Sequence, residues 1–200
     1  PHLEAHRLPG LDAGPGSIYP LYADQSLVNL PASLCHWLGA PHFGAPPLRR
    51  EILDLYQPPF KHVILLVVDG FGLDILENAL QPGGQDGDYA VWSDLARDAA
   101  LAPLTSVAPS TTATALTTFW TGRAPAEHGV MGYEVWLKEF GLIANMILHN
   151  PASYAGDVGG LSKAGFDPQT FLPVPTLGPH LARHGIASYA FQHYSIARSG

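Results

Sequence analysis

Cysteine and basic residues are scarce in this chain, and each shortage excludes a class of protein. Cys35 is the single cysteine, so no disulfide can form within the chain, and the redox compartment stays open. Lys and Arg number 10 against 17 Asp and Glu, which gives a net charge of −7 with neutral His. No basic cluster occurs along the sequence, so we expect no surface that follows the phosphates of a nucleic acid.

Long apolar runs and targeting signals are also missing from the sequence. No apolar run approaches the roughly 20 residues that a membrane-spanning helix needs, and no signal-peptide pattern occurs. The missing signal peptide slightly favours a cytoplasmic protein. However, the chain begins with Pro1 rather than Met, which leaves its native N-terminus, and therefore its compartment, open.

The residues that are present predict an ordered domain. The 200 residues are enough for one domain of good size. With 21 Gly and 19 Pro, these two residue types make up a fifth of the chain, while Trp, Tyr and Phe are plentiful. This combination predicts a packed core with long, rigid loops rather than a disordered chain.

An unbroken run of six apolar residues, Val63 to Val68, is the clearest strand signal. Four of the six are β-branched, which is typical of a strand buried on both faces. Asp69 follows at once, and Gly70 and Gly72 let the backbone turn sharply. A carboxylate just past the carboxyl end of a parallel strand lies where open α/β sheets bind their ligands. Asp69 is therefore either a metal ligand or the cap of the helix that follows.

The remaining patterns alternate between helices and strands. Expected helices cover residues 26–38, 48–55, 73 to the breaker at Pro82, 91–100, 110–120 and 176–184; expected strands cover 101–107 and 186–191, with a hairpin over 131–139 and 141–148. Residues 1–24 read as an extended arm and 150–175 as a long loop. This order predicts an α/β fold with a mainly parallel sheet and helices on both faces.

Hydroxyl groups crowd the turn after the second expected strand. Pro109 turns the chain, and Ser110, Thr111 and Thr112 stand at the start of the next helix. A helix N-terminus offers free N–H groups and partial positive charge, which suit a bound phosphate, and a hydroxyl there can become a nucleophile. Taken alone, a Thr-rich helix start of this kind is more often explained by simple capping together with β-branched packing.

Three segments in this order resemble the alkaline phosphatase superfamily, in its nucleotide pyrophosphatase/phosphodiesterase branch. They are Val68-Asp69-Gly70, the turn Pro109–Thr112, and Thr121–Gly129, which reads TGRAPAEHG. In the family the nucleophilic Thr stands three residues after such a Pro and nine before the Thr-Gly pair, and both counts lead to Thr112. The segments span about a third of the chain.

The resemblance implies an alkaline-phosphatase-like fold and a hydrolase of phosphodiester or pyrophosphate bonds. Asp69 and Thr112 would bind one of two divalent metal ions, usually zinc, with manganese as an alternative. Thr112 would attack phosphorus and form a covalent phosphothreonine that water releases. The substrate would be a small phosphate ester or a nucleotide. His128 is interpreted as a structural residue that holds the loop after the helix.

The chain departs from the family in two ways. The family's Asn shortly after the His-Gly pair, which donates to a phosphate oxygen, is replaced by Gly132-Tyr133, and Asn145 is the candidate substitute. The family's further Asp and His ligands have no recognisable counterpart up to Gly200. We therefore expect residues 1–200 to be the N-terminal part of one catalytic domain, truncated and inactive alone.

Two other functions stay open from the sequence. One is phosphomonoester hydrolysis or phosphomutase activity within the same superfamily; sulfatases are disfavoured because they use a modified Cys or Ser where this chain has Thr112. The other is a non-catalytic binding module that keeps the fold. The substrate and the oligomeric state cannot be read from the sequence.

Overall fold

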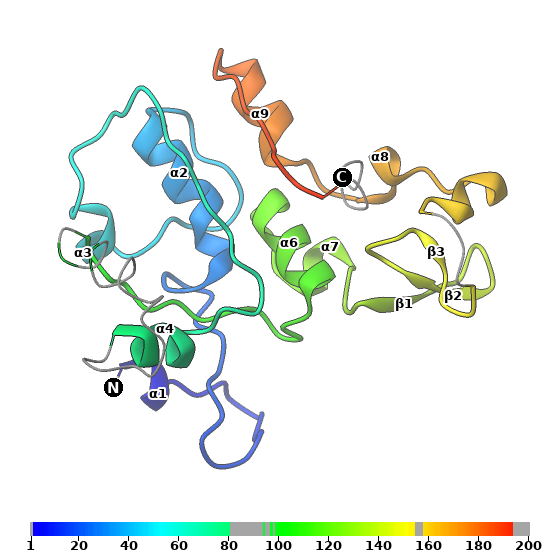
Figure 1. Cartoon of the computed structure of the whole chain (residues 1–200), viewed down its shortest axis with the longest axis horizontal. Helices are drawn as coiled ribbons and strands as arrows, with labels where there is room; N and C mark the ends of the chain where they lie inside the picture. The colour runs from blue at the N-terminus through cyan, green and yellow to red at the C-terminus, as the bar shows by residue number, and fades with distance from the viewer. Residues whose placement is uncertain (1, 81–93, 95–96, 98, 155–157, 194–200) are drawn as a thin grey trace.

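The structure is a computed structural model that describes residues 2–80, 94, 97, 99–154 and 158–193. Among the regular elements of these residues, helices and short 3-10 turns outweigh strands (Figure 1). The elements are α1 (His2–Ala5), η1 (Leu27–Asn29), α2 (Leu30–Leu38), α3 (Arg50–Leu53), α4 (Leu73–Leu80), α6 (Thr112–Thr121), α7 (Pro125–His128), β1 (Glu134–Leu137), β2 (Leu142–Asn145), β3 (Asn150–Pro151), η3 (Gly160–Ala164), α8 (Pro168–Phe171) and α9 (Leu177–Arg183).

Helix α6 lies between the α2 side of the molecule and the hairpin side (Figure 1) and belongs to both hydrophobic cores. Ala113, near its start, packs in the first core, whose other members are Val130, Leu137, Ala144, Met146, Leu161 and Phe166. Phe119, near its end, packs in the second core, with Leu34, Cys35, Phe43, Leu177 and Leu181. Two cores therefore fix the direction and position of α6.

The Thr-rich composition of α6 is tolerated because its hydroxyls are paired. Thr residues lose side-chain freedom in a helix and compete for its backbone. Here Thr117 Oγ1 donates to the Ala113 carbonyl at 2.8 Å, and Thr121 Oγ1 donates to the Thr117 carbonyl at 2.7 Å, the back-bonding typical of Thr inside helices. Gly122 ends the helix with φ +61°, a left-handed conformation that glycine adopts at little cost.

The sheet in the described residues is small and antiparallel. Strand β1 pairs with β2, with Glu134 opposite Asn145 and Leu137 opposite Leu142, and β2 pairs with β3. The turn between β1 and β2 contains Gly141, with φ +63°. The hairpin predicted around Phe140-Gly141 is therefore confirmed, and the chain combines helices with strands as expected.

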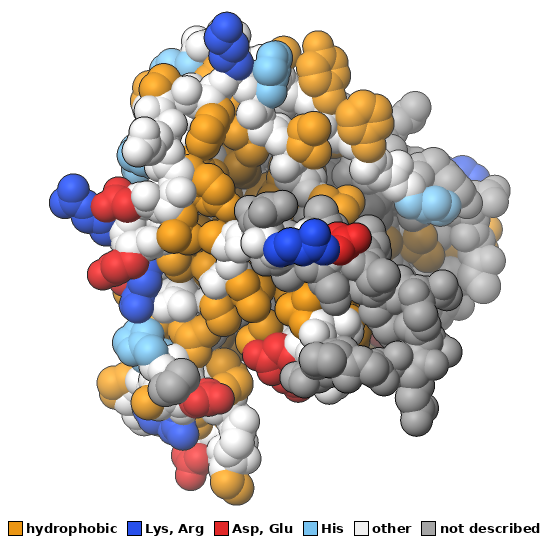
Figure 2. Space-filling view, turned by 60° about the vertical axis from the view of Figure 1, so that its left-hand side comes forward, with side chains coloured by type: hydrophobic (Ala, Val, Ile, Leu, Met, Phe, Trp, Pro, Cys, Tyr) orange, Lys and Arg blue, Asp and Glu red, His pale blue; other side chains and the backbone are white. Residues whose placement is uncertain are grey.

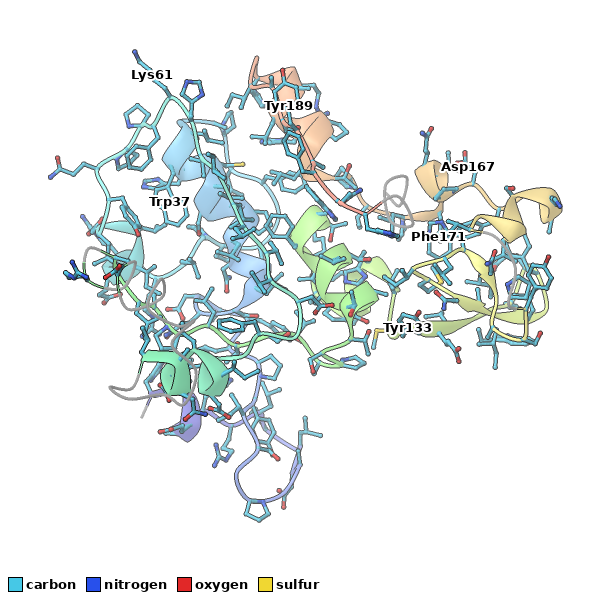
Figure 3. All side chains as sticks on the ribbon, viewed as in Figure 1. Trp37, Lys61, Tyr133, Asp167, Phe171 and Tyr189 are labelled. Atoms are coloured by element: carbon cyan, nitrogen blue, oxygen red, sulfur yellow. The ribbon has the colours of Figure 1, made fainter. Side chains whose placement is uncertain are left out.

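The mainly parallel sheet predicted from the sequence is not found among the described residues. Segment 63–68 is extended but forms no strand, and its apolar side chains are exposed, with Ile64 at 96% and Leu66 at 79%. Segment 186–191 is likewise no strand; its Tyr189, labelled beside α9 in Figure 3, is 81% exposed. The sequence pattern shows only that the side chains of these segments would suit a buried strand. A strand forms only where a neighbour accepts its backbone hydrogen bonds, and within the described residues the backbone of 61–68 makes none.

Apolar side chains gather in a band down the face of the molecule shown in Figure 2. The exposed large apolar residues of the chain include all six members of segment 63–68. A contiguous exposed patch of this kind is uncommon on a monomeric soluble protein. The extended segment therefore has the composition of a core strand without the covering layer that such a strand needs.

The helix predictions agree with the structure where it can be compared. The helix predicted for residues 26–38 is found as η1 followed by α2, which begins beside Pro31 and ends just before Gly39. The helices predicted near residues 48–55, from 73, at 110–120 and at 176–184 correspond to α3, α4, α6 and α9. The helix predicted for 91–100 lies largely outside the described residues. The predicted loop 150–175 contains β3, η3 and α8.

The single cysteine, Cys35, lies in the protein interior. Cys35 is fully buried in the second core, and burial raises the pKa of its thiol, which makes it unreactive. None of the helices in the described ranges has the length and apolar character needed to cross a bilayer.

Candidate active site

Asp69 stands at the end of the extended segment, directly before the turn into α4. The chain reverses at Gly70, whose φ of +72° requires a residue without a Cβ for low strain. The Asp69 side chain is exposed to solvent. Asp69 lies four residues before the first residue of α4, so it is not that helix's N-cap.

Thr112 is the first residue of α6, and its neighbour Thr111 is the N-cap. Thr111 Oγ1 accepts from the Thr114 backbone N–H at 3.4 Å and lies 2.9 Å from the Thr114 hydroxyl. The capping function belongs to Thr111, so the Thr112 hydroxyl is left for another partner. A helix start at Thr112 also places first-turn N–H groups, which have no acceptor within the helix, close to that hydroxyl.

The two residues singled out from the sequence meet across a gap of 43 positions. Thr112 Oγ1 donates a hydrogen bond to Asp69 Oδ2 at 2.8 Å. Since the hydroxyl proton points toward the carboxylate, the lone pairs of the hydroxyl oxygen are left for a cation or for phosphorus. The pair lies at the N-terminus of a ten-residue helix, where the helix dipole favours a bound anion such as a phosphate group.

The two oxygens of Asp69 and Thr112 are too few to complete the coordination of a divalent cation. Carboxylate and hydroxyl oxygens are ligands that such ions accept, yet a catalytic zinc usually has three protein ligands. Within residues 2–80, 94, 97, 99–154 and 158–193, no group of three or more His, Cys, Asp or Glu side chains is placed to hold a metal. The chemistry of Asp69 and Thr112 therefore fits part of a metal site.

The segment Thr121–Gly129, which reads TGRAPAEHG, supports α6 by fixing the chain that follows the helix. Gly122 ends α6 and approaches Gly44 closely: a Cβ added to Gly44 would lie 2.6 Å from the Gly122 carbonyl oxygen. Glu127 then caps α7 by accepting from the Ala124 N–H at 2.8 Å. At the end of α7, Gly129 turns the chain with φ +83°. These contacts explain the spacing of the segment without any ligand.

His128 is the buried centre of this support. Its side chain is 1% exposed. Its Nδ1 accepts from the Val130 backbone N–H at 3.1 Å, so the neutral ring carries its proton on Nε2, which donates to Thr118 Oγ1 at 2.9 Å. Burial lowers the pKa of His128 to about 4, and the negative charge of Glu127 only partly opposes this effect. His128 is thus a neutral structural residue that ties α7 to α6, as the sequence suggested.

Asn145, the candidate substitute for the family's phosphate-binding Asn, serves a turn. Its Oδ1 accepts from the backbone N–H groups of Ile147 and Leu148 at 3.0 and 2.9 Å. These contacts give the side chain a structural task at the end of β2. Its contact with a substrate stays a prediction.

Of the acidic and His side chains downstream of the three matched segments, Asp167 and His149 have structural partners. Asp167 caps α8, on the hairpin side of the molecule in Figure 3, by accepting from the Gln169 N–H at 3.0 Å. His149 packs on Phe166, with ring centroids 5.2 Å apart, and burial lowers its pKa. Asp157 lies outside the described residues.

The strand predicted for 101–107 is found only as a single bridge residue, Thr105, and sequence reasoning did not find the residues that hold this segment before the turn. Tyr22 OH accepts from the Ala108 N–H at 3.0 Å, and Thr105 is bonded on several sides by residues 21–27. The first 24 residues carry no periodic pattern, so no local signal indicates that part of them packs against a segment some 80 positions away.

Comparison with known proteins agrees with the order of these motifs. The sequence model for type I phosphodiesterase/nucleotide pyrophosphatase matches residues 63–170, from the extended segment to α8. This match covers more than half of the chain and indicates a hydrolase of phosphate esters. The chain belongs to the type I phosphodiesterase/nucleotide pyrophosphatase family, whose members are generally metal-dependent. No curated protein and no solved structure matches the chain.

Proposed function

We propose that this chain carries the nucleophile of a metal-dependent hydrolase of phosphodiester or pyrophosphate bonds. The observation that carries the proposal is the 2.8 Å hydrogen bond from Thr112 Oγ1 to Asp69 Oδ2 at the first turn of α6. Family membership supports the type of reaction and a small phosphate ester or nucleotide as the substrate.

In the proposed reaction, Thr112 Oγ1 gives up its proton to solvent and forms a bond to phosphorus, while the bond from phosphorus to the leaving oxygen breaks and that oxygen takes up a proton. The product of this step is a phosphothreonine, and a water molecule then cleaves it and restores the hydroxyl. Asp69 orients the hydroxyl before attack by accepting its hydrogen bond. The first N–H groups of α6 add positive potential where the phosphoryl oxygens would lie.

We propose two divalent ions as cofactors, zinc in the first place and manganese as the alternative. Asp69 and Thr112 would hold one of them. Bound metal ions supply Lewis-acid stabilisation of the charge on the phosphoryl oxygens. Two oxygens leave such an ion under-coordinated, and the extended segment lacks a covering layer. Both observations support residues 1–200 being the N-terminal part of an alkaline-phosphatase-like domain whose parallel sheet and remaining ligands include other residues.

A comparison of two neighbouring threonines tests the proposal in the full-length protein. Thr112→Ala should abolish zinc-dependent hydrolysis of a phosphodiester reporter, because it removes the attacking oxygen. Thr111→Ala is the matched control, since it loses only the N-cap, at a cost of about 1 kcal/mol of stability. Acid quenching during turnover, followed by mass spectrometry, should find phosphate on Thr112 of the wild-type protein.

The alternative functions give different results in the same experiment. Near-normal turnover by Thr112→Ala would mean that Ser110 or Thr111 is the nucleophile instead. A strong preference for a phosphomonoester reporter would indicate a phosphomonoesterase or phosphomutase. Binding of a nucleotide without turnover, in the presence of zinc or manganese, would support the non-catalytic module.

A further inference from the structure

Segment 103–108 leads directly into the turn that carries Thr112, and residues 21–27 hold it along its length. A parallel bridge joins Ser26 to Thr105. The backbone contacts of this bridge run from the Thr105 N–H to the Gln25 carbonyl and from the Leu27 N–H to the Thr105 carbonyl, both at 3.0 Å. On either side, Gln25 Nε2 donates to the Pro103 carbonyl at 2.9 Å and Ser26 Oγ donates to the Ser106 carbonyl at 3.3 Å.

The side chain of Thr105 strengthens this attachment. Its hydroxyl accepts from the Leu21 N–H at 2.9 Å and donates to the Gln25 carbonyl at 3.1 Å. The residue is buried, with 5% of its surface exposed. The hydroxyl therefore both donates and accepts at a buried position, where hydrogen bonds are electrostatically stronger than in water.

Tyr22 extends the attachment to the edge of the nucleophile turn. Its hydroxyl accepts from the Ala108 N–H at 3.0 Å. Its own backbone is fixed from the other side, because the carbonyl of Tyr22 accepts from Asn29 Nδ2 at 3.0 Å. Asn29 is completely buried and also donates to the Pro46 carbonyl at 2.8 Å. Tyr22 thus connects a buried polar centre to the residue just before Pro109.

The turn itself has few other fixed points. The side chains of Ala108, Pro109 and Ser110 are exposed. Beyond them, Thr111 is fixed as the N-cap of α6, and Thr112 begins the helix. Among the described residues, the hydrogen bond from Ala108 to Tyr22 is therefore the last one that residues 21–27 make before the nucleophile.

We propose that Tyr22 is a positioning residue for Thr112, acting through its hydrogen bond to Ala108; this inference rests on the proposed function of Thr112. Loss of the hydroxyl lets the turn occupy other arrangements, so a smaller fraction of the protein holds Thr112 against Asp69. The substrate does not contact Tyr22 in this account. The rate of attack should therefore fall while substrate binding stays the same.

Two tyrosine variants of the full-length protein with added zinc test the inference. Tyr22→Phe removes the hydroxyl and keeps the ring. Tyr19→Phe is the matched control, since its hydroxyl also accepts a backbone hydrogen bond, from the Ala13 N–H at 2.6 Å, away from the nucleophile turn. We expect Tyr22→Phe to lower kcat by about three- to tenfold, the effect of one neutral hydrogen bond, with KM unchanged. Tyr19→Phe should keep the wild-type kcat.

Amide hydrogen exchange of the peptide that spans residues 104–112 provides a readout that does not depend on activity. Tyr22→Phe should speed exchange at Ala108, whose N–H loses its acceptor, and Tyr19→Phe should not. Wild-type exchange in Tyr22→Phe, or faster exchange with unchanged kcat, would overturn the positioning role. Failure of the proposed function is seen separately, as a wild-type protein that never acquires phosphate on Thr112.

Discussion

Acid should lower the free energy of unfolding through His128, whose buried ring connects α7 to α6. The ordinary pKa of a His side chain is 6.5, whereas burial lowers that of His128 to about 4. Between these two values the unfolded chain binds more protons than the folded protein, so the free energy of unfolding increases with pH. The contribution of His128 is complete above pH 6.5 and is lost progressively as the pH falls toward 4.

The structure gives a reason and a magnitude for this loss. Protonation places a hydrogen on Nδ1, which in the native fold accepts from the Val130 N–H at 3.1 Å. Two donors then face each other in a site that is 1% exposed, and only the negative charge of Glu127 favours the cation. A change in pKa from 6.5 to about 4 corresponds to about 3 kcal/mol, with a limiting slope of about 1.4 kcal/mol per pH unit.

His128→Asn isolates this effect because Asn carries an oxygen close to the position of Nδ1. The variant keeps an acceptor for the Val130 N–H and loses the contact with Thr118, which should cost about 1–3 kcal/mol at pH 7. Urea unfolding followed by tryptophan fluorescence gives the free energy of unfolding for both proteins from pH 4 to 7. Other groups that titrate there, including His149, cancel in the difference between the two.

The wild-type protein should be the more stable of the two at pH 7, and its advantage should shrink or reverse as the pH falls to 4. A constant difference across this range would refute the reasoning, since His128 would then have the same pKa in the folded and unfolded states. A difference that grows on acidification would show that the folded protein stabilises the protonated ring.

Three further predictions follow from the site and its supports. Asp69→Asn should weaken zinc binding and turnover together in the full-length protein. Residues 1–200 alone should bind zinc no more tightly than a surface site, because Asp69 and Thr112 supply only two oxygens. Calorimetric titration with zinc measures the affinity in both cases. Leu66→Lys should reduce self-association of the same 200-residue chain in analytical ultracentrifugation, because it places a charge in the exposed apolar segment. Gly44→Ala should lower the free energy of unfolding by about 1–3 kcal/mol or more, measured by urea unfolding, since φ there is +76° and a Cβ would lie 2.6 Å from the Gly122 carbonyl oxygen.

Local patterns in the sequence predicted the parts of the fold that depend on local interactions. Helix α2 ends at Leu38 because the next residue, Gly39, adopts the left-handed conformation that a helix end needs. The hairpin follows from two strand-like runs around Gly141. The closeness of Asp69 and Thr112 was also predictable, because family motifs keep the order and spacing of residues that meet in space.

Long-range packing could not be predicted in the same way. Residues 63–68 have the composition of a buried strand, but composition does not supply the partner strands that would pair with their backbone. The contact between Tyr22 and Ala108 joins residues 86 positions apart, and Tyr22 lies in a stretch without periodicity. Such contacts depend on the whole fold, so only a structure reveals them.

The two halves of the candidate site differ in how firmly the fold holds them. Thr112 begins a helix that two hydrophobic cores fix, whereas Asp69 follows an extended segment whose apolar side chains are exposed. A cation that binds both oxygens must order the weaker partner, and the free energy of that ordering is subtracted from the binding free energy. Whatever covers segment 63–68 would fix Asp69 in advance and raise the metal affinity without touching the metal. If Asp69 and Thr112 bind a cation as we propose, its affinity should therefore depend on the packing of the extended segment as well as on the number of ligands.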